Sequence, residues 1–102
     1  MFPLRQEATM YVLVIHDISD PQRFFDTAAK AIPELPEHLK LHLTVPARDG
    51  IRAICVWEAE SSAAVREYLE PALAEFSRNE YFEAENFEGI AMPTRLAAEA
   101  TA

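Results

Sequence analysis

Two histidines and a glutamate lie at positions from which they could form one site. His16 ends an apolar run, His42 lies in a stretch where apolar and polar residues alternate, and Glu83 lies in a similar stretch further on. Two imidazoles and a carboxylate suit a borderline divalent ion such as Ni²⁺ or Zn²⁺. One interpretation is therefore a metal site with His16, His42 and Glu83 as its ligands.

The same part of the molecule could bind an organic molecule instead. The ligand-binding residues would then be His16, His42, Arg52, Tyr81 and Glu83, with Asp17 at the border. An enzyme would use the same residues differently. The third alternative is a binding or interaction module without catalysis, in which these side chains only bond to neighbours. The residue types alone leave all three alternatives open.

Two further residues with chemical potential are predicted to belong to the core. Cys55 is the only cysteine, so it forms no internal disulfide, and it lies in a strand pattern where a buried, unreactive thiol is common. Trp57 is expected on the face of the sheet that the helices cover. The chain has two glycines and no glycine-rich phosphate-binding motif, so no nucleotide cofactor is expected.

The overall charge argues against a nucleic-acid partner. The chain has 17 acidic and nine basic residues, which gives a formal net charge of −8. Phosphate binding needs a clustered surplus of lysine and arginine, and an anionic membrane needs the same. The N-terminal segment lacks the apolar core of a signal peptide, and no run is long enough to span a membrane. A cytoplasmic location is expected.

A predicted β-hairpin determines where His42 points. Residues 39–58 alternate between apolar and polar, pass through Asp49-Gly50 and alternate again. With residues 46–50 as the loop, the predicted pairs are Val45 with Ile51, Leu43 with Ala53, Leu41 with Cys55, and Leu39 with Trp57. These residues would face the helices. The other face would carry Lys40, His42, Thr44, Arg52, Ile54, Val56 and Glu58, with Glu58 too far along the sheet to join His16.

The first strand and helix are predicted from an apolar run and a capping signal. Residues 11–15 are apolar and mostly β-branched, as in a central strand. Asp20 and Pro21 then provide an N-cap and a first-turn proline. The helix that follows has an apolar stripe and ends near Pro33 and Pro36. The stripe consists of Phe24, Phe25, Ala28, Ala29 and Ile32.

The second helix and the last strand complete the pattern. Ser61 or Ser62 is the expected N-cap of a helix that should kink or break near Glu70, because Pro71 has no amide hydrogen. Residues 81–87 alternate again and are predicted to form a strand. Phe82 and Ala84 would face the helices, and Tyr81 and Glu83 would face the other way.

This order of elements predicts one α+β domain over residues 1–102, with its core at about residues 10–89 and flexible termini. A split β-α-β, ferredoxin-like arrangement follows, with a four-stranded antiparallel sheet of order 4-1-3-2 and two helices on one face. The uncovered face would carry Ile54, Val56 and either Val12 or Val14. Because this surface is too apolar for water, we expect a homodimer with sheets packed face to face.

The chain also resembles a known group of proteins. The segments YVLVIHDI, ICVWEAESSAAVREYL and NEYFEAE, in this order, are similar to ferredoxin-like proteins of the dimeric α/β-barrel type. The similarity is greatest to small bacterial domains of unknown function that include a nickel-binding member. The resemblance implies a dimer with a cavity for nickel or for a small organic substrate of a cofactor-independent monooxygenase or isomerase. In such an enzyme, His16 would serve as the base, and Tyr81 or Arg52 would stabilise an enolate. Where the nickel-binding member has adjacent histidines, this chain has Ile15 and His16.

Overall fold

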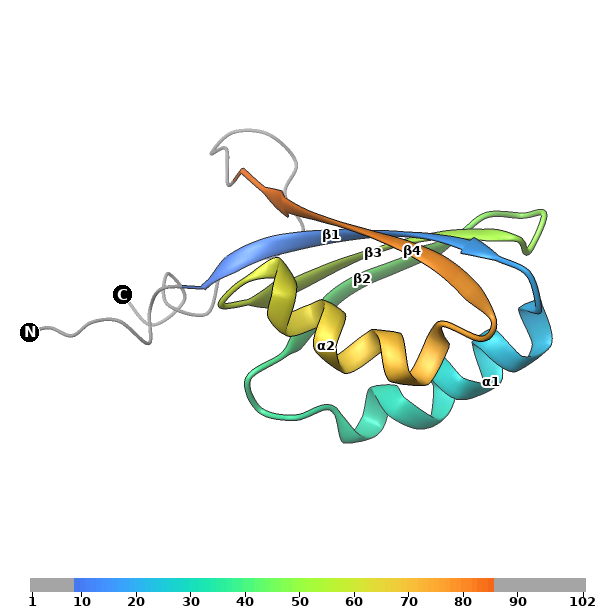
Figure 1. Ribbon diagram of the computed structural model, residues 1–102, viewed down its shortest axis with the longest axis horizontal. Coiled ribbons are helices and arrows are strands. Elements are labelled where there is room, and N and C mark those ends of the chain that lie inside the picture. Colours follow the sequence, from blue (N-terminus) through green and yellow to red (C-terminus); the bar gives the residue numbers. More distant parts are fainter. Residues whose placement is uncertain (1–8, 86–102) are drawn as a thin grey trace, which may run out of the picture.

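A computed structural model describes residues 9–85 as a four-stranded antiparallel sheet with two helices on one face (Figure 1). The strand order β2-β3-β1-β4 confirms the predicted ferredoxin-like α+β arrangement. The predictions for both chain ends, including the continuation of the last strand to residue 87, lie outside the described residues. The elements are β1 (Met10–Ile18), α1 (Pro21–Ala31), a 3-10 turn η2 (Ile32–Glu34), β2 (Lys40–Pro46), β3 (Arg52–Ala59), α2 (Ser62–Leu73) and β4 (Ser77–Ala84).

Both helices begin where the capping signals predict. The Asp20 side chain accepts a hydrogen bond from the amide of Arg23, and Ser61 Oγ accepts one from the amide of Ala64. Each contact satisfies an amide that has no partner within its own helix. The expected break near Glu70 is wrong, because α2 continues through Pro71 to Leu73. Pro71 lies in the last turn, and the amide of Ala74 still bonds to the carbonyl of Glu70.

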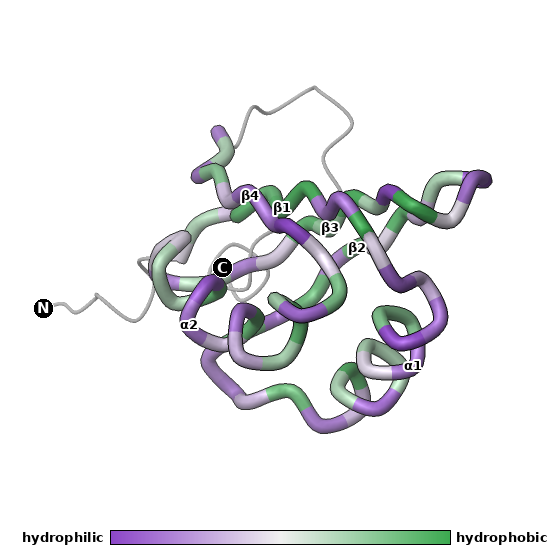
Figure 2. The backbone as a smooth tube through the Cα atoms, turned by 45° about the vertical axis from the view of Figure 1, so that its right-hand side comes forward, coloured by the Kyte–Doolittle hydropathy of each residue, from purple (hydrophilic) through white to green (hydrophobic). Residues whose placement is uncertain are grey.

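The core lies between the helices and the sheet. β3 contributes alternate residues to it, among them Cys55 and Trp57, as predicted. β1 contributes Val12 and Val14, so the prediction that one of these valines lies on the uncovered face is wrong. Figure 2 shows apolar and polar residues following one another along the strands. None of the helices within residues 9–85 is long and apolar enough to cross a membrane.

A β-bulge changes the predicted register of the hairpin. Leu41 pairs with Trp57, but Leu43 pairs with Val56, so His42 is an extra residue in β2. Beyond the bulge, Leu43 and Val45 point away from the helices, and Thr44 points toward them beside Cys55. The predicted pairs are wrong on both sides of the bulge, so the strands also pair in a different register from the one predicted. The turn itself contains Gly50 with a φ of 79°, which glycine adopts without strain.

The last strand begins earlier than predicted, and the face that it turns toward the helices is opposite to the predicted one. β4 starts at Ser77, and Tyr81 and Glu83 contact side chains of α2. Phe82 is 46% exposed on the uncovered face. The predicted orientation of Phe82 and Ala84 is therefore wrong. Hydrogen bonding to α2 determines which face of β4 lies toward the helices, since Tyr81 donates to the carboxylate of Glu70 there.

Candidate functional site

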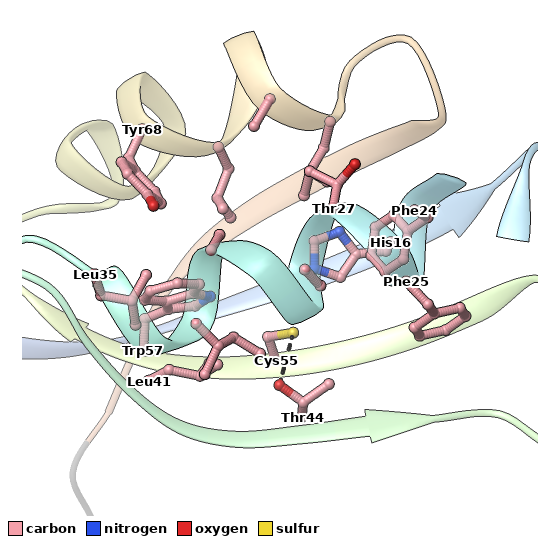
Figure 3. A pocket seen from close by; sticks show the side chains of 16 residues that line it. His16, Phe24, Phe25, Thr27, Leu35, Leu41, Thr44, Cys55, Trp57 and Tyr68 are labelled. Carbon is pink, nitrogen blue, oxygen red and sulfur yellow. Dashed lines mark hydrogen bonds between the residues drawn. The ribbon is translucent and has the colours of Figure 1, made fainter. Parts of the chain in front are cut away.

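A small pocket lies between the sheet and the two helices. Its volume is about 60 Å³, it is partly open, and its wall is almost entirely apolar. Figure 3 shows His16 toward one end and Trp57 toward the other, with Cys55 and Thr44 between them. One water needs only about 10–15 Å³ of such space, so the pocket can admit part of a small organic molecule. Ligand pockets typically combine such a wall with a few polar groups.

His16 is the most buried polar residue in this pocket, with 1% of its surface exposed. Its Nδ1 lies 2.6 Å from Asn79 Oδ1, within hydrogen-bond distance, and the edge of the Phe24 ring packs against it at 5.0 Å between centroids. Burial lowers the pKa of His16, although the hydrogen bond to Asn79 and the charge of Glu70 oppose this effect. The imidazole is therefore neutral at pH 7.

A polar network extends from Asn79, the residue at Nδ1 of the imidazole. Asn79 Nδ2 donates to Glu70 Oε2 over 3.0 Å, and the Tyr81 hydroxyl donates to the same oxygen over 2.5 Å. Ser77 Oγ lies 2.8 Å from Asn79 Oδ1. The bond from Tyr81 lowers the pKa of Glu70, with a second contribution from Asn79. Burial, followed by the bond to Glu70, raises the pKa of Tyr81, so this phenol stays protonated.

Trp57 provides an unusual feature at the other end of the pocket. Its side chain is buried, and its indole nitrogen is the buried side-chain polar atom within residues 9–85 that has no hydrogen-bond partner. A buried donor without a partner destabilises a fold by about 1–3 kcal/mol. An acceptor placed in the pocket would remove this penalty.

Cys55 lies in the same wall but is a weak nucleophile. Its Sγ is 3.6 Å from Thr44 Oγ1, and burial raises the pKa of the thiol. A thiol that stays protonated reacts slowly with electrophiles. The predicted burial of Cys55 is confirmed. Its side chain forms part of the pocket wall.

The structure does not bring the expected cluster together. His16 lies on the helix-covered face, whereas His42 lies on the other face, where its Nε2 is 3.0 Å from Glu58 Oε1. The pairing of His42 with Glu58 was not predicted. The bulge turns the imidazole of His42 toward this carboxylate, which also accepts a hydrogen bond from Thr9 over 2.7 Å.

The remaining predicted residues lie in three different places. Tyr81 belongs to the His16 network described above. Arg52 forms an exposed ion pair with Asp49 in the hairpin turn at 2.7 Å, and this pair lowers the pKa of Asp49. Glu83 Oε2 lies 3.4 Å from the amide of Ser62 at the N-terminus of α2, where negative charge is favourable. Asp17 is exposed on the uncovered face, opposite Arg52 in the register.

The three residues expected to bind a metal ion therefore do not lie together. His16 and Glu83 lie on the helix side of the sheet, and His42 lies on the opposite side. Among residues 9–85, no group of three or more histidine, cysteine, aspartate or glutamate side chains is arranged to hold a metal ion.

Asn79, Glu70 and Trp57 were not predicted as site residues. One signal was present, because Ser77, Asn79 and Tyr81 alternate and all can hydrogen-bond. Polar residues at alternate positions share one face of a strand. The position of Glu70 beside them depends on how α2 crosses β4, which the sequence does not show.

The stability of the protein is expected to fall as the pH drops below 6.5, the ordinary pKa of histidine, because burial lowers the pKa of His16 in the folded state. In this range the unfolded chain binds a proton more readily than the folded chain, so protonation favours unfolding. Urea unfolding between about pH 7.5 and 5.5 measures the loss. The His16→Gln variant should lose less stability over the same range. An equal loss in both proteins would contradict this prediction.

Comparisons with known proteins do not assign the chain to a family. A scan against protein-family models finds no match, and searches of curated proteins and of solved structures find none either. The resemblance to the dimeric α/β-barrel type therefore stays a prediction. Because one fold supports many unrelated functions, the functional argument depends on the pocket itself.

Proposed function

We propose that this protein binds a small, mainly apolar organic molecule in the pocket between the sheet and the helices. The observation that carries this proposal is the buried indole N–H of Trp57, which lacks a partner in a pocket that also contains His16. An unpartnered donor and a buried imidazole in an apolar wall are the features that orient a ligand. The side chains expected to bind nickel or zinc are divided between the two faces of the sheet, so the proposed ligand is organic.

The ligand is expected to place an acceptor against Trp57 and an apolar body against the helices. α1 contributes Phe24, Phe25 and Ala28 to the wall, and α2 contributes Leu69 and Leu73. Each buried CH₂ group of a ligand would contribute about 0.8 kcal/mol. One recovered hydrogen bond would add about 1 kcal/mol. Such a site would select ligands mainly by the shape of their apolar part, and to a smaller extent by the position of the acceptor.

Fluorescence of Trp57 tests the proposal directly, because it is the only tryptophan in the chain. Phenol and toluene serve as probes, since both have a small apolar ring. Saturable changes in the emission of Trp57 are expected with both. A linear change without saturation would contradict a defined site.

Two alanines of α1 provide a matched pair of variants. Ala28 lines the pocket, and its neighbour Ala29 is exposed and does not. Ala28→Leu is expected to fill part of the pocket and weaken probe binding by about tenfold or more, since about 1.4 kcal/mol corresponds to a factor of ten. Ala29→Leu should bind as the unmodified protein does. Equal binding by both variants would place the probe elsewhere.

A catalytic role is the second candidate, and His16 is the observation that favours it. A neutral, buried imidazole with one ring nitrogen already bonded is suited to accept a proton from a bound substrate. A cofactor-independent isomerisation or oxygenation would use it in this way. Binding of a ligand is the first step of either role, so the probe experiment applies to both.

The proposal includes a second copy of the chain on the uncovered face of the sheet. The register places seven apolar side chains side by side there: Leu13, Ile15, Leu43, Val45, Ile54, Val56 and Phe82. Four of them are between 44% and 56% exposed. Basic and acidic residues border this apolar patch, with Arg52 and Arg78 beside Asp17 and Glu80. Two copies related by a twofold axis could therefore bury the apolar patch and pair opposite charges.

A further inference from the structure

One carboxylate determines how a neighbouring amide is oriented. Glu70 Oε2 accepts hydrogen bonds from Tyr81 and from Asn79 Nδ2. An ionised carboxylate can only accept, so the part of the Asn79 amide that faces it must be the NH₂ group. The carbonyl oxygen of Asn79 then faces Ser77 and His16, at 2.8 Å from Ser77 Oγ and 2.6 Å from His16 Nδ1.

The orientation of this amide determines the tautomer of His16. Asn79 Oδ1 has no hydrogen to give, so Nδ1 of His16 must carry the proton in their 2.6 Å contact. In a neutral ring, Nε2 is then unprotonated and keeps its lone pair. No residue in the described part of the chain bonds to Nε2, and the ring lines the pocket. Figure 3 shows the ring between the sheet and the helices, within reach of the pocket interior.

We infer that Glu70 and Asn79 are positioning residues that hold His16 as the Nδ1–H tautomer, so that Nε2 serves the pocket as a hydrogen-bond acceptor and base. The choice of ligand rests on the proposed function. The lone pair of Nε2 attracts a hydrogen-bond donor and repels an anion. The expected ligands are therefore neutral molecules with a weakly acidic hydroxyl group, such as a phenol or an enol. Trp57 provides the complementary donor at the other end of the pocket.

The same arrangement supports proton transfer. If a bound hydroxyl ionises, its O–H bond breaks, the electron pair stays on the oxygen, and the proton forms a new N–H bond at Nε2. The resulting imidazolium keeps its bond to Asn79, and the charge of Glu70 stabilises it. The other titratable groups nearby are Tyr81 and Arg66, which surround Glu70. Cys55 on β3 and Tyr68 on α2 also line the pocket. The residues of α1 that line the pocket are not titratable.

Nitrogen NMR of the unliganded protein tests the tautomer without any ligand. Long-range ¹H–¹⁵N spectra distinguish a protonated ring nitrogen from a bare one, and His16 can be assigned through its own ring protons. At neutral pH, Nδ1 is expected to be protonated and Nε2 bare. A protonated Nε2 with a bare Nδ1 would overturn the inference. The result does not depend on whether any variant folds or any probe binds.

Two variants test the two positioning residues. Glu70→Gln keeps the shape of the side chain but removes its charge, so His16 is expected to titrate at a lower pH than in the unmodified protein. Asn79→Asp keeps an acceptor for Nδ1 and adds a charge, so the Nδ1–H tautomer should persist and His16 should titrate at a higher pH. If the midpoint of the His16 titration is unchanged in both variants, a positioning role for Glu70 and Asn79 is contradicted, whatever the stability of the variants.

The ligand class is tested by comparing phenol with anisole. Anisole has the same ring and oxygen but no hydroxyl hydrogen, so it cannot donate to Nε2. Phenol should bind about fivefold to tenfold more tightly, which corresponds to roughly 1 kcal/mol for one hydrogen bond. Equal affinity would overturn the assignment to hydroxyl donors while leaving the pocket itself intact. Absence of binding by either compound would contradict the proposed function but not the tautomer.

Discussion

Replacing His42 with leucine is expected to lower the free energy of unfolding by about 3 kcal/mol, because Glu58 would lose a partner in a buried site. The side chains of His42 and Glu58 are 1% and 3% exposed, and 3.0 Å separates Nε2 from Oε1. The ring of Tyr11 packs edge-on against His42 at 5.4 Å, so water cannot easily replace the lost contact. Urea unfolding measures the change.

A double variant separates the loss of the partner from the loss of packing. In His42→Leu with Glu58→Met, both polar groups are replaced by apolar groups of similar size. Such replacements of buried ion pairs are often neutral or stabilising, so much of the lost stability should return. A loss below about 1 kcal/mol in the single variant would show that the carboxylate does not depend on His42.

Replacing Ile54 with glutamate is expected to separate the proposed dimer into monomers. Ile54 lies in the middle of the apolar patch on the uncovered face, between Ile15 and Val45 in the register, and is 45% exposed. Each copy would bring one carboxylate into the interface, and burying both without partners should weaken association by at least about a hundredfold. Light scattering should report twice 11.5 kDa for the unmodified protein and 11.5 kDa for the variant.

Ile32 provides a matched control for this substitution. It is 44% exposed, nearly as much as Ile54, but it lies on η2 beyond the end of α1. Ile32→Glu should therefore give the same mass in light scattering as the unmodified protein. A mass of 11.5 kDa for the unmodified protein at tens of micromolar would remove the proposal of a dimer.

The order of the elements was predictable because each has a local signal. The apolar run of β1, the caps at Asp20 and Ser61, and the turn at Gly50 identify their elements without knowledge of distant contacts. The same signals do not reveal which side of β1 faces the helices, because residues 11–15 are all apolar. The orientation of His16 follows from that choice, and so the sequence could not assign it to a face.

The two wrong strand assignments have separate causes. In β2, one extra residue at His42 reverses every side chain beyond it, and alternation cannot reveal an insertion of this kind. In β4, Tyr81 and Phe82 are both aromatic, and either could have been buried. The carboxylate of Glu70 decides between them, since it offers a hydrogen bond that only Tyr81 can use. Both causes are contacts between residues that are distant in sequence.

The bulge at His42 also affects how copies of this chain can meet. β2 and β4 are the edges of the sheet, and edge strands attract further strands that lead to aggregation. The irregular hydrogen-bond spacing at the bulge, with Lys40 before it and Pro46 after it, makes β2 a poor template for strand addition. Charged residues occupy β4 at Arg78, Glu80 and Glu83. Both borders of the sheet therefore disfavour strand addition, and in the proposed dimer the copies would meet through the uncovered face instead.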